Sequence, residues 1–276
     1  MANIVSATLE EKVRKAQRAD RSALEELVRQ IQDKVYGLAL RMLWHPEDAR
    51  DATQEILLLV VTRLASFCGD SQFFTWAYRI TANHLLRFRK SRLEEQGLSF
   101  ETFGKDLEEG LSDASIHPDD SLLLQEIRIG CTLGMLLCLD RPHRIAYILG
   151  DILEMDGPEA ASILRVSESV FRKRLERART RLTEFMRARC GLANPKNACR
   201  CRKRLHRAIE LKRVDRSNLL FAGDRGNAAS FPKVLVTIRK LEETQRAVAL
   251  YRSHPEYAVP NFTAAVQHLL DCREIP

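Results

Sequence analysis

The chain has 276 residues, of which 45% are hydrophobic and 29% charged, and its formal net charge is +7. This length is sufficient for two domains. No apolar run reaches the roughly 18 residues of a membrane helix, and the first residues lack the apolar core of a signal peptide. We therefore expect a cytoplasmic protein with no membrane partner. Seven cysteines in such a chain indicate reduced thiols or a metal site rather than a disulfide framework.

The positive charge is concentrated in one stretch. Between Arg172 and Arg213, sixteen Lys or Arg residues stand against three Glu residues. This gives a local charge of +13 and leaves about −6 for the rest of the chain, which indicates a local site for a polyanion. Because Gly and Pro are sparse in residues 1–92 and 122–190, we expect an all-α fold.

The first predicted elements are a short charged helix over residues 7–18 and a core helix over residues 23–43, where Leu, Ile and Val recur at helical spacing. The helix that follows carries an acidic face. Asp48, Asp51 and Glu55 lie at positions i, i+3 and i+7, with Gln54 beside them. Acids in a first turn stabilise a helix through its dipole, but this effect does not extend to Glu55. We interpret the face as a docking surface for a basic partner.

Aromatic and cationic residues are interleaved between residues 67 and 92. The aromatic residues are Phe73, Phe74, Trp76 and Tyr78, and the polar residues that follow them are Arg79, Asn83, Arg87, Arg89, Lys90 and Arg92. Stacking surfaces combined with cations are typical of proteins that bind single-stranded DNA. The alternative is that Phe74, Trp76 and Ile80 are core residues and the cations are solvated.

Residues 93–121 differ in composition from both neighbours. Nine acids and a single Lys or Arg, Lys105, lie between residues 93 and 120, with few apolar residues. This composition predicts a flexible acidic linker. The linker could mimic nucleic acid inside a partner's channel or act as a solvated spacer, and we favour the spacer.

Residues 122–189 are predicted to form a second helical domain. Two apolar helices span residues 122–153, and residues 157–186 are typical of a helix-turn-helix. Its second helix has an inward stripe at Phe171, Leu175, Ala178 and Leu182, and outward cations at Arg172, Lys173, Arg174, Arg177, Arg179 and Arg181. Such a helix fits a DNA major groove, although a solvated basic helix is the alternative. Arg165 is unusual in the turn, where Gly would adopt a positive φ more easily.

Three motifs together resemble the extracytoplasmic-function group of bacterial sigma factors. Residues 48–55, DARDATQE, are similar to the family's polymerase-clamp helix, and residues 74–83, FTWAYRITAN, to its −10 reading helix. Residues 159–182 are similar to its −35 helix-turn-helix. The resemblance covers roughly residues 20–190. It implies an all-α fold in which region 2 (residues 1–92) and region 4 (residues 122–189) are joined by the linker.

The resemblance also implies a function without catalysis: a subunit that gives core RNA polymerase its promoter specificity and helps to melt DNA. The residues implied for polymerase binding are Asp48, Asp51, Gln54 and Glu55. Those implied for the −10 element are Thr75, Trp76, Arg79, Asn83 and Arg87, and those for the −35 element are Arg172, Lys173, Glu176 and Arg177. The implied partners are core RNA polymerase, promoter DNA, and either an anti-sigma factor or the chain's own C-terminal extension.

Residues 190–276 form that extension. Cys190, Cys199, Cys201 and His206 could hold zinc, although no cofactor is required, and reactive or unligated thiols remain alternatives. Helices are predicted over residues 233–252 and 261–272 and are expected to dock on the sigma domains. The extension's cationic run could either lengthen the DNA contact or dock as a lid on the chain's own acids, for which the candidates are Glu108, Glu109, Asp119 and Asp120. We favour the lid.

A different function remains open at this point. The chain could be a stand-alone helix-turn-helix regulator with a metal- or thiol-sensing C-terminal segment. Such a regulator requires neither the acidic face nor the helix that combines aromatic residues with Asn83, so these two features favour the promoter-specificity subunit.

Overall fold

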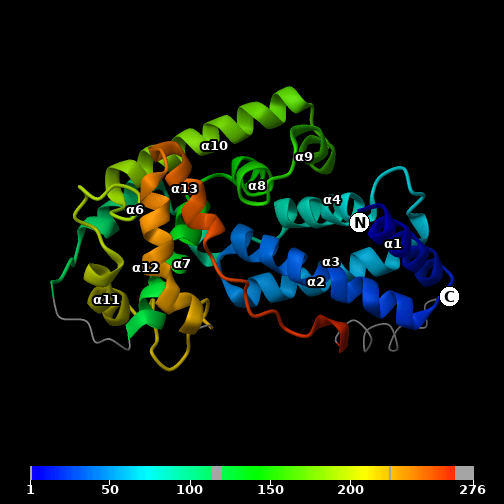
Figure 1. Ribbon diagram of the computed structural model, residues 1–276, viewed down its shortest axis with the longest axis horizontal. Coiled ribbons are helices and arrows are strands. Elements are labelled where there is room, and N and C mark those ends of the chain that lie inside the picture. Colours follow the sequence, from blue (N-terminus) through cyan, green and yellow to red (C-terminus); the bar gives the residue numbers. More distant parts are fainter. Residues whose placement is uncertain (1, 114–119, 224, 265–276) are drawn as a thin grey trace. The chain divides into compact units, whose positions relative to one another are not determined.

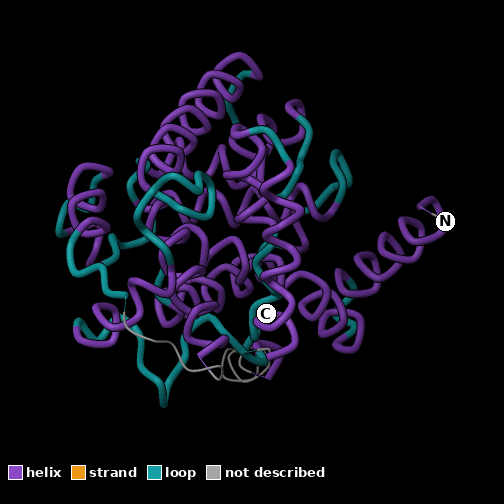
Figure 2. The backbone as a smooth tube through the Cα atoms, turned by 60° about the vertical axis from the view of Figure 1, so that its left-hand side comes forward, coloured by secondary structure: helices purple, strands orange, loops and turns teal. Residues whose placement is uncertain are grey.

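The computed structural model describes residues 2–113, 120–223 and 225–264 (Figure 1). Within these ranges the regular elements are helices, apart from an isolated β-bridge between Asp215 and Asn218 (Figure 2). The all-α prediction is confirmed. Over the same residues, no helix has the length and apolar character required to cross a membrane. The chain divides into two compact units, of which one comprises residues 90–157 and 168–258 and the other the remaining described residues.

The first unit is built on the helix predicted over residues 23–43. Its elements are α1 (Ala2–Gln17), α2 (Arg21–Leu43), α3 (Pro46–Thr62), η1 (Leu64–Ser66), α4 (Phe73–Arg87) and most of α9 (Gly157–Leu164). The carboxylate of Asp20 caps α2 by accepting a hydrogen bond from the backbone N–H of Ala23 at 3.0 Å. Leu27, Ile31 and Leu38 of α2 are buried, and α2 packs on α1, α3 and α4.

The second unit contains the predicted second domain together with the linker and the extension. Its elements are α5 (Arg92–Glu95), α6 (Phe100–Glu108), α7 (Ser121–Leu137), α8 (Arg141–Tyr147), the π-helical turn η3 (Ile148–Ile152), α10 (Glu168–Arg189), α11 (Cys201–Glu210), α12 (Arg225–Lys240) and α13 (Glu243–Arg252). Pro142 lies in the first turn of α8, where its missing N–H costs no hydrogen bond. Helices α8 and α10 pack together through buried residues that include Ile145, Phe171 and Leu182.

The structure describes residues 93–113 of the predicted linker, and over these residues the prediction of flexibility is wrong. Helices α5 and α6 lie in this part. Ser99 and Thr102 form a capping box at the start of α6, in which each side chain bonds to the other's backbone N–H. Phe100 and Phe103 pack against Phe185 of α10, with ring centroids 5.1 and 6.0 Å apart. These aromatic contacts give the segment an apolar anchor that its average composition conceals.

The acids of the linker pair with cations of other elements in the second unit. These ion pairs are Glu94 with Arg141 and Arg144, Asp106 with Arg204 and Arg213, Glu108 with Arg189, Asp113 with Lys203, and Asp120 with Arg216. Docking of the cationic run on the predicted acids is therefore correct for Glu108, which pairs with Arg189, whereas Asp120 pairs with Arg216, a residue beyond that run. Glu109 contributes its backbone carbonyl, which accepts from Arg204, and Asp119 lies outside the described residues.

The extension packs against α7 and α10 of the same unit through α11, α12 and α13. A single helix over residues 233–252 is incorrect, because α12 ends at Lys240 and α13 starts at Glu243. Tyr251 of α13 is fully buried, and its hydroxyl donates to the carbonyl of Thr132 in α7 at 3.1 Å. Of the helix predicted over residues 261–272, only residues 262–264 are helical within the described range, and the rest lies outside it.

Candidate nucleic-acid interface

The acidic side chains of α3 lie on the side of the helix that faces solvent. Ala49, Ala52 and Ile56 bury the opposite side completely. Asp51 and Glu55 are exposed, and Asp48 and Gln54 are half-buried. The structure therefore brings the four predicted polymerase-binding residues onto one surface, hereafter the acidic face.

Arg89 and His84, which the sequence did not indicate for this role, contact the acidic face. Arg89 donates from Nη2 to Asp48 Oδ1 at 2.8 Å and to Asp51 Oδ2 at 3.0 Å. His84 Nε2 lies 3.2 Å from Glu55 Oε2. Burial lowers the pKa of His84 despite the opposing charge of Glu55, so the imidazole is neutral at pH 7. The charged Arg89 therefore partly neutralises the acidic face. The sequence could not indicate this contact, because it depends on how the end of α4 lies beside α3 in the folded chain.

Helix α4 divides its aromatic residues between the core and the surface. Phe73 and Ile80 are buried, whereas Phe74 and Trp76 are half-buried. Trp76 packs against Phe67 and Phe73, with ring centroids 5.4 and 5.9 Å apart. The alternative prediction, that these are core residues, is therefore correct for Ile80. Phe74 and Trp76 are only partly buried and so belong only in part to the core.

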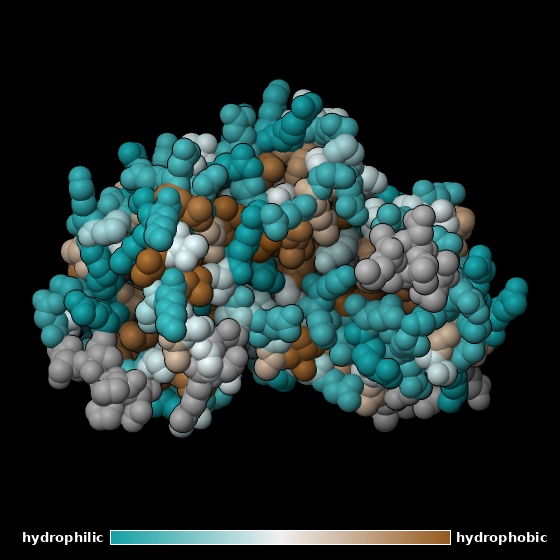
Figure 3. All heavy atoms as spheres, in the orientation of Figure 1, coloured by the Kyte–Doolittle hydropathy of each residue, from teal (hydrophilic) through white to brown (hydrophobic). Residues whose placement is uncertain are grey.

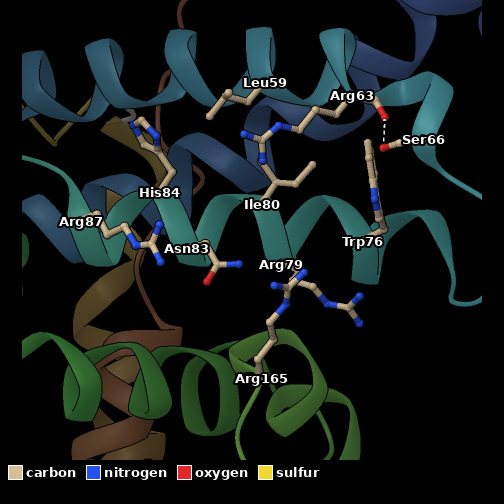
Figure 4. A pocket seen from close by; sticks show the side chains of 10 residues that line it. All are labelled: Leu59, Arg63, Ser66, Trp76, Arg79, Ile80, Asn83, His84, Arg87 and Arg165. Atoms are coloured by element: carbon tan, nitrogen blue, oxygen red, sulfur yellow. Dashed lines mark hydrogen bonds between the residues drawn. The ribbon is translucent and has the colours of Figure 1, made fainter.

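A pocket of about 470 Å³ opens beside Trp76 (Figure 4). It combines Trp76 and Asn83 of α4 with four arginines, Arg63, Arg79, Arg87 and Arg165. In Figure 4 the guanidinium of Arg165 points toward Arg79, and Asn83 lies between Arg79 and Arg87 along α4. An aromatic ring, an amide and several guanidinium groups suit a nucleotide, whose base can stack while its phosphate is neutralised. We hereafter call this the α4 pocket.

Two of the predicted −10 residues are bonded to α9. Thr75 is buried, and its hydroxyl donates to Glu159 Oε1 at 2.9 Å. Arg79 donates from Nη2 to the hydroxyl of Ser162 at 3.0 Å. Asn83 is half-buried and Arg87 is exposed. The structure thus collects Trp76, Arg79, Asn83 and Arg87 at one pocket and places the Thr75 side chain beneath that surface.

The turn after α9 has the strained backbone that its sequence predicts. Arg165 adopts a φ of +53°, in the left-handed region that Gly occupies most easily. The backbone N–H of Val166 donates to the carbonyl of Ala161 at 3.1 Å, which closes the turn.

Helix α10 has the two faces that its sequence predicts. Phe171, Ala178 and Leu182 are buried and Leu175 is half-buried. The four predicted −35 residues are exposed: Arg172, Lys173, Glu176 and Arg177. Hydrophilic side chains cover the top of the view in Figure 3, where Figure 1 draws α10. Arg179 differs from them, since it donates to both carboxylate oxygens of Asp151 at 2.9 and 2.6 Å and so anchors the helix to η3.

Comparison with known proteins shows which proteins this chain is similar to. Residues 27–94, which include α3 and α4, match the family described as Sigma-70 region 2. The chain is 26% identical over 184 residues to the ECF RNA polymerase sigma factor SigW of Bacillus subtilis, across 65% of this chain and 97% of that protein. Over these ranges the chain is similar to RNA polymerase sigma factors of the extracytoplasmic-function group.

Two further relatives and one solved structure are also similar to this chain. It is 28% identical to the RNA polymerase sigma factor YlaC of Bacillus subtilis, over 60% of this chain and 93% of that protein. It is 30% identical to the ECF RNA polymerase sigma factor SigE of Mycolicibacterium smegmatis, over 59% of this chain and 61% of the relative. Among solved structures, CnrH in complex with the cytosolic domain of CnrY is similar, with 22% identity, a TM-score of 0.45, and coverage of 63% of this chain and 94% of that chain.

In the extension, Cys190 is buried and Cys199 and Cys201 are half-buried. Burial raises the pKa of Cys131 in α7, and the nearby Cys190, Cys201 and Cys199 raise it further. His206, by contrast, is exposed on α11. Among the residues that the structure describes, no group of three or more His, Cys, Asp or Glu side chains is arranged to hold a metal ion. The zinc set of Cys190, Cys199, Cys201 and His206 therefore stays a prediction, and Cys131 is a neighbour that the sequence did not indicate.

Proposed function

We propose that this chain is a promoter-specificity subunit that binds core RNA polymerase, recognises the −35 and −10 elements and helps to open the DNA. One observation carries the proposal: a region 2 match that includes both an exposed acidic face and a pocket suited to a nucleotide. The exposed cationic face of α10 adds a second DNA-binding surface. No step of this function requires catalysis by the chain, and its place of action would be the cytoplasm, where the polymerase is.

The acidic face of α3 would dock on a basic surface of the polymerase. Asp51 and Glu55 are exposed and Asp48 and Gln54 half-exposed, so a partner can reach all four. Arg89 partly neutralises Asp48 and Asp51. It is itself 62% exposed at the side chain and can move away when a partner's cations arrive. Charge complementarity of this kind mainly sets association rate and specificity.

The α4 pocket would receive a base flipped from the −10 strand. Unstacking a base costs a few kcal/mol, which contacts in a pocket must offset. Trp76 offers a stacking face, Asn83 both a donor and an acceptor for a base edge, and Arg87 a cation for the backbone. In the free chain α9 accepts hydrogen bonds from the side chains of Thr75 and Arg79 in α4. Thr75 is buried and would have to leave Glu159 to contact DNA, whereas Arg79 also lines the pocket.

The exposed face of α10 would enter the major groove at the −35 element. Arg172, Lys173 and Arg177 are cations that suit guanine edges or phosphates, and Glu176 can accept from the amino group of cytosine. Since all four side chains are exposed, none has to leave a buried contact to reach a base.

Transcription in vitro tests this function directly. Purified core polymerase, which lacks promoter specificity, is supplied with the full-length chain and a library of promoter fragments. A promoter-specificity subunit yields discrete transcripts that share −35 and −10 sequences. A stand-alone regulator would bind duplex DNA yet produce no transcript with core polymerase, and that result would replace the proposal. Adding a candidate anti-sigma factor to the same reaction tests that predicted partner.

A further inference from the structure

A second pocket lies in the other compact unit, between α7 and α12. Its volume is about 600 Å³, within the range of small-molecule sites. Helices α7 and α12 pack against each other (Figure 1), and the start of α11 contributes to the wall. The lining is mainly apolar, with Leu124 from α7 and Phe231 and Leu235 from α12. None of the residues proposed for polymerase or DNA binding lines it.

The pocket contains a buried guanidinium that has no carboxylate partner. Arg128 is 2% exposed, and no carboxylate of the described chain forms an ion pair with it. Its Nη1 donates to the hydroxyl of Ser253 at 3.0 Å, and its guanidinium lies 3.8 Å from the ring centroid of Phe231. Its Nε is buried and has no hydrogen-bond acceptor among the described residues. A buried cation with one neutral acceptor and one ring is incompletely compensated.

Gln125 lies three residues before Arg128 in α7, lines the same pocket and is also unsatisfied. Its side chain is 3% exposed, and neither Oε1 nor Nε2 has a hydrogen-bond partner in the described structure. Folded proteins rarely bury an amide without partners, so such a group points to a molecule that is bound in use. The amide can offer one donor and one acceptor to that molecule beside the guanidinium of Arg128.

Charge defines the remaining chemistry. Arg200, Arg202 and Arg239 join Arg128 in the lining, and the described lining includes no Asp or Glu. Arg200 is already engaged with backbone carbonyls of its own loop, whereas Arg202 and Arg239 are exposed. Burial lowers the pKa of Arg128 to about 10, so its guanidinium remains charged at neutral pH. The pocket therefore combines an apolar wall with a permanent positive charge.

We infer that this pocket binds a small organic acid with an aromatic or branched apolar body. The carboxylate would pair with Arg128, which matches it in geometry. A neighbouring hydroxyl or amide of the ligand would satisfy Gln125. The apolar body would lie against Leu124, Phe231 and Leu235. Because its walls come from α7 and from α12 of the extension, the ligand would hold these two helices together.

Calorimetric titration of the full-length chain with 2-naphthoate tests the inference. Two probes serve as controls. The amine 2-naphthylmethylamine has the same ring without the negative charge, and inorganic phosphate has negative charge without the ring. We expect 2-naphthoate to bind at least tenfold more tightly than either. Equal binding of the acid and the amine would show that the cavity selects only apolar surface and would overturn the inference. So would an absence of 2-naphthoate binding up to millimolar concentration.

Variants locate the binding site. Arg128→Met should weaken 2-naphthoate binding at least tenfold, and circular dichroism checks that the variant is folded. Two exposed positions avoid the risk of misfolding. Arg239→Gln removes a lining cation and should weaken binding about threefold, whereas Lys240→Gln removes the adjacent cation, which does not line the pocket, and should have no effect. Equal effects of Arg239→Gln and Lys240→Gln would contradict the proposed location.

Discussion

Arg89 donates from Nη2 to Oδ1 of Asp48 at 2.8 Å, so the acidic face of α3 carries a cation from the same chain. The pair joins residues from α3 and from the segment just after α4, within one compact unit. Exposed ion pairs contribute only about 0–1 kcal/mol, because water screens them. The contact is therefore weak enough for a basic partner to replace Arg89. Loss of the acids and loss of Arg89 should consequently change polymerase binding in opposite directions.

Reversing the acidic face should weaken core-polymerase binding. The double variant Asp51→Lys and Glu55→Lys should lose about tenfold in affinity, and the loss should shrink as salt rises, since both side chains are exposed. Arg89→Gln should strengthen binding about two- to threefold by removing the internal competitor. Fluorescence anisotropy with labelled chain measures both. Glu101→Lys, at an exposed position of α6, is the control for charge alone. Unaltered binding by a folded double variant would remove the clamp role from α3.

Asn83→Ala should impair DNA opening without affecting duplex recognition. Losing the contacts of a flipped base should cost about 1–2 kcal/mol, which corresponds to roughly a tenfold smaller population of open complexes. Permanganate reactivity of −10 thymines measures the opening, and band-shift with a −35 duplex gives the control. If permanganate reactivity stays at the level of the parent chain, the α4 pocket does not hold the −10 base.

Arg172→Ala and Arg179→Ala should separate DNA reading from helix anchoring. Arg172 is exposed, so its loss should reduce binding by about 1–3 kcal/mol at one base pair if it contacts a base edge. Arg179 is tied to Asp151, so its loss should lower stability and leave sequence preference unchanged. Binding to a library of single-base promoter variants distinguishes the two. Uniform loss for Arg172→Ala would identify a phosphate contact instead of a base contact.

The features that sequence predicted well are those set by local periodicity. The inward stripe of α10 and the acidic face of α3 follow from spacings of three and four residues, and both appear as expected. The positive φ of Arg165 was equally local. Each depends on residues within a few turns of one helix, where geometry is fixed by the α-helical repeat.

The features that sequence missed depend on pairs that are distant in the chain. Glu94 pairs with Arg141 across 47 positions and Asp106 with Arg204 across 98. Counting acids in residues 93–121 therefore predicted disorder, because the count could not include cations from α8 and α11. The same applies to Arg89 and Asp48, and to Cys131, whose thiol neighbours lie far along the chain.

Acid should weaken the second unit through Glu94. Burial opposes its ionisation, but hydrogen bonds from Arg141 and the charge of Arg144 prevail and lower its pKa to about 2, from 4.5 in an unfolded chain. Because the pKa of Glu94 is lower in the folded chain, its ionised carboxylate stabilises the fold fully above about pH 5. This stabilisation is lost as the pH falls from about 4.5 toward 2. Glu94→Gln should therefore cost about 2–3 kcal/mol at pH 7 and little at pH 2.

Urea titrations followed by circular dichroism, repeated across this pH range, measure the effect of Glu94. Glu101→Gln is the matched control, because Glu101 is exposed on α6 and its ion pair in the described structure is with Lys105, four residues away. The parent chain and Glu94→Gln should converge in stability as the pH approaches 2. A constant difference between them at all pH values would mean that the effect of the substitution is packing and not ionisation.

Thiol reactivity should divide the described cysteines into one fast and several slow residues. Cys68 is exposed. Burial raises the pKa of Cys201 to about 12 and that of Cys199 to about 11, so little reactive thiolate forms at pH 8. Ellman's reagent, applied to a Cys272→Ser background because Cys272 lies outside the described residues, should therefore modify one thiol quickly. Cys68→Ser should remove that fast phase, and urea should expose the rest.

A fast phase that persists in Cys68→Ser would show that the thiols of the extension are open to solvent. A chelator that accelerates the slow phase would support the zinc prediction.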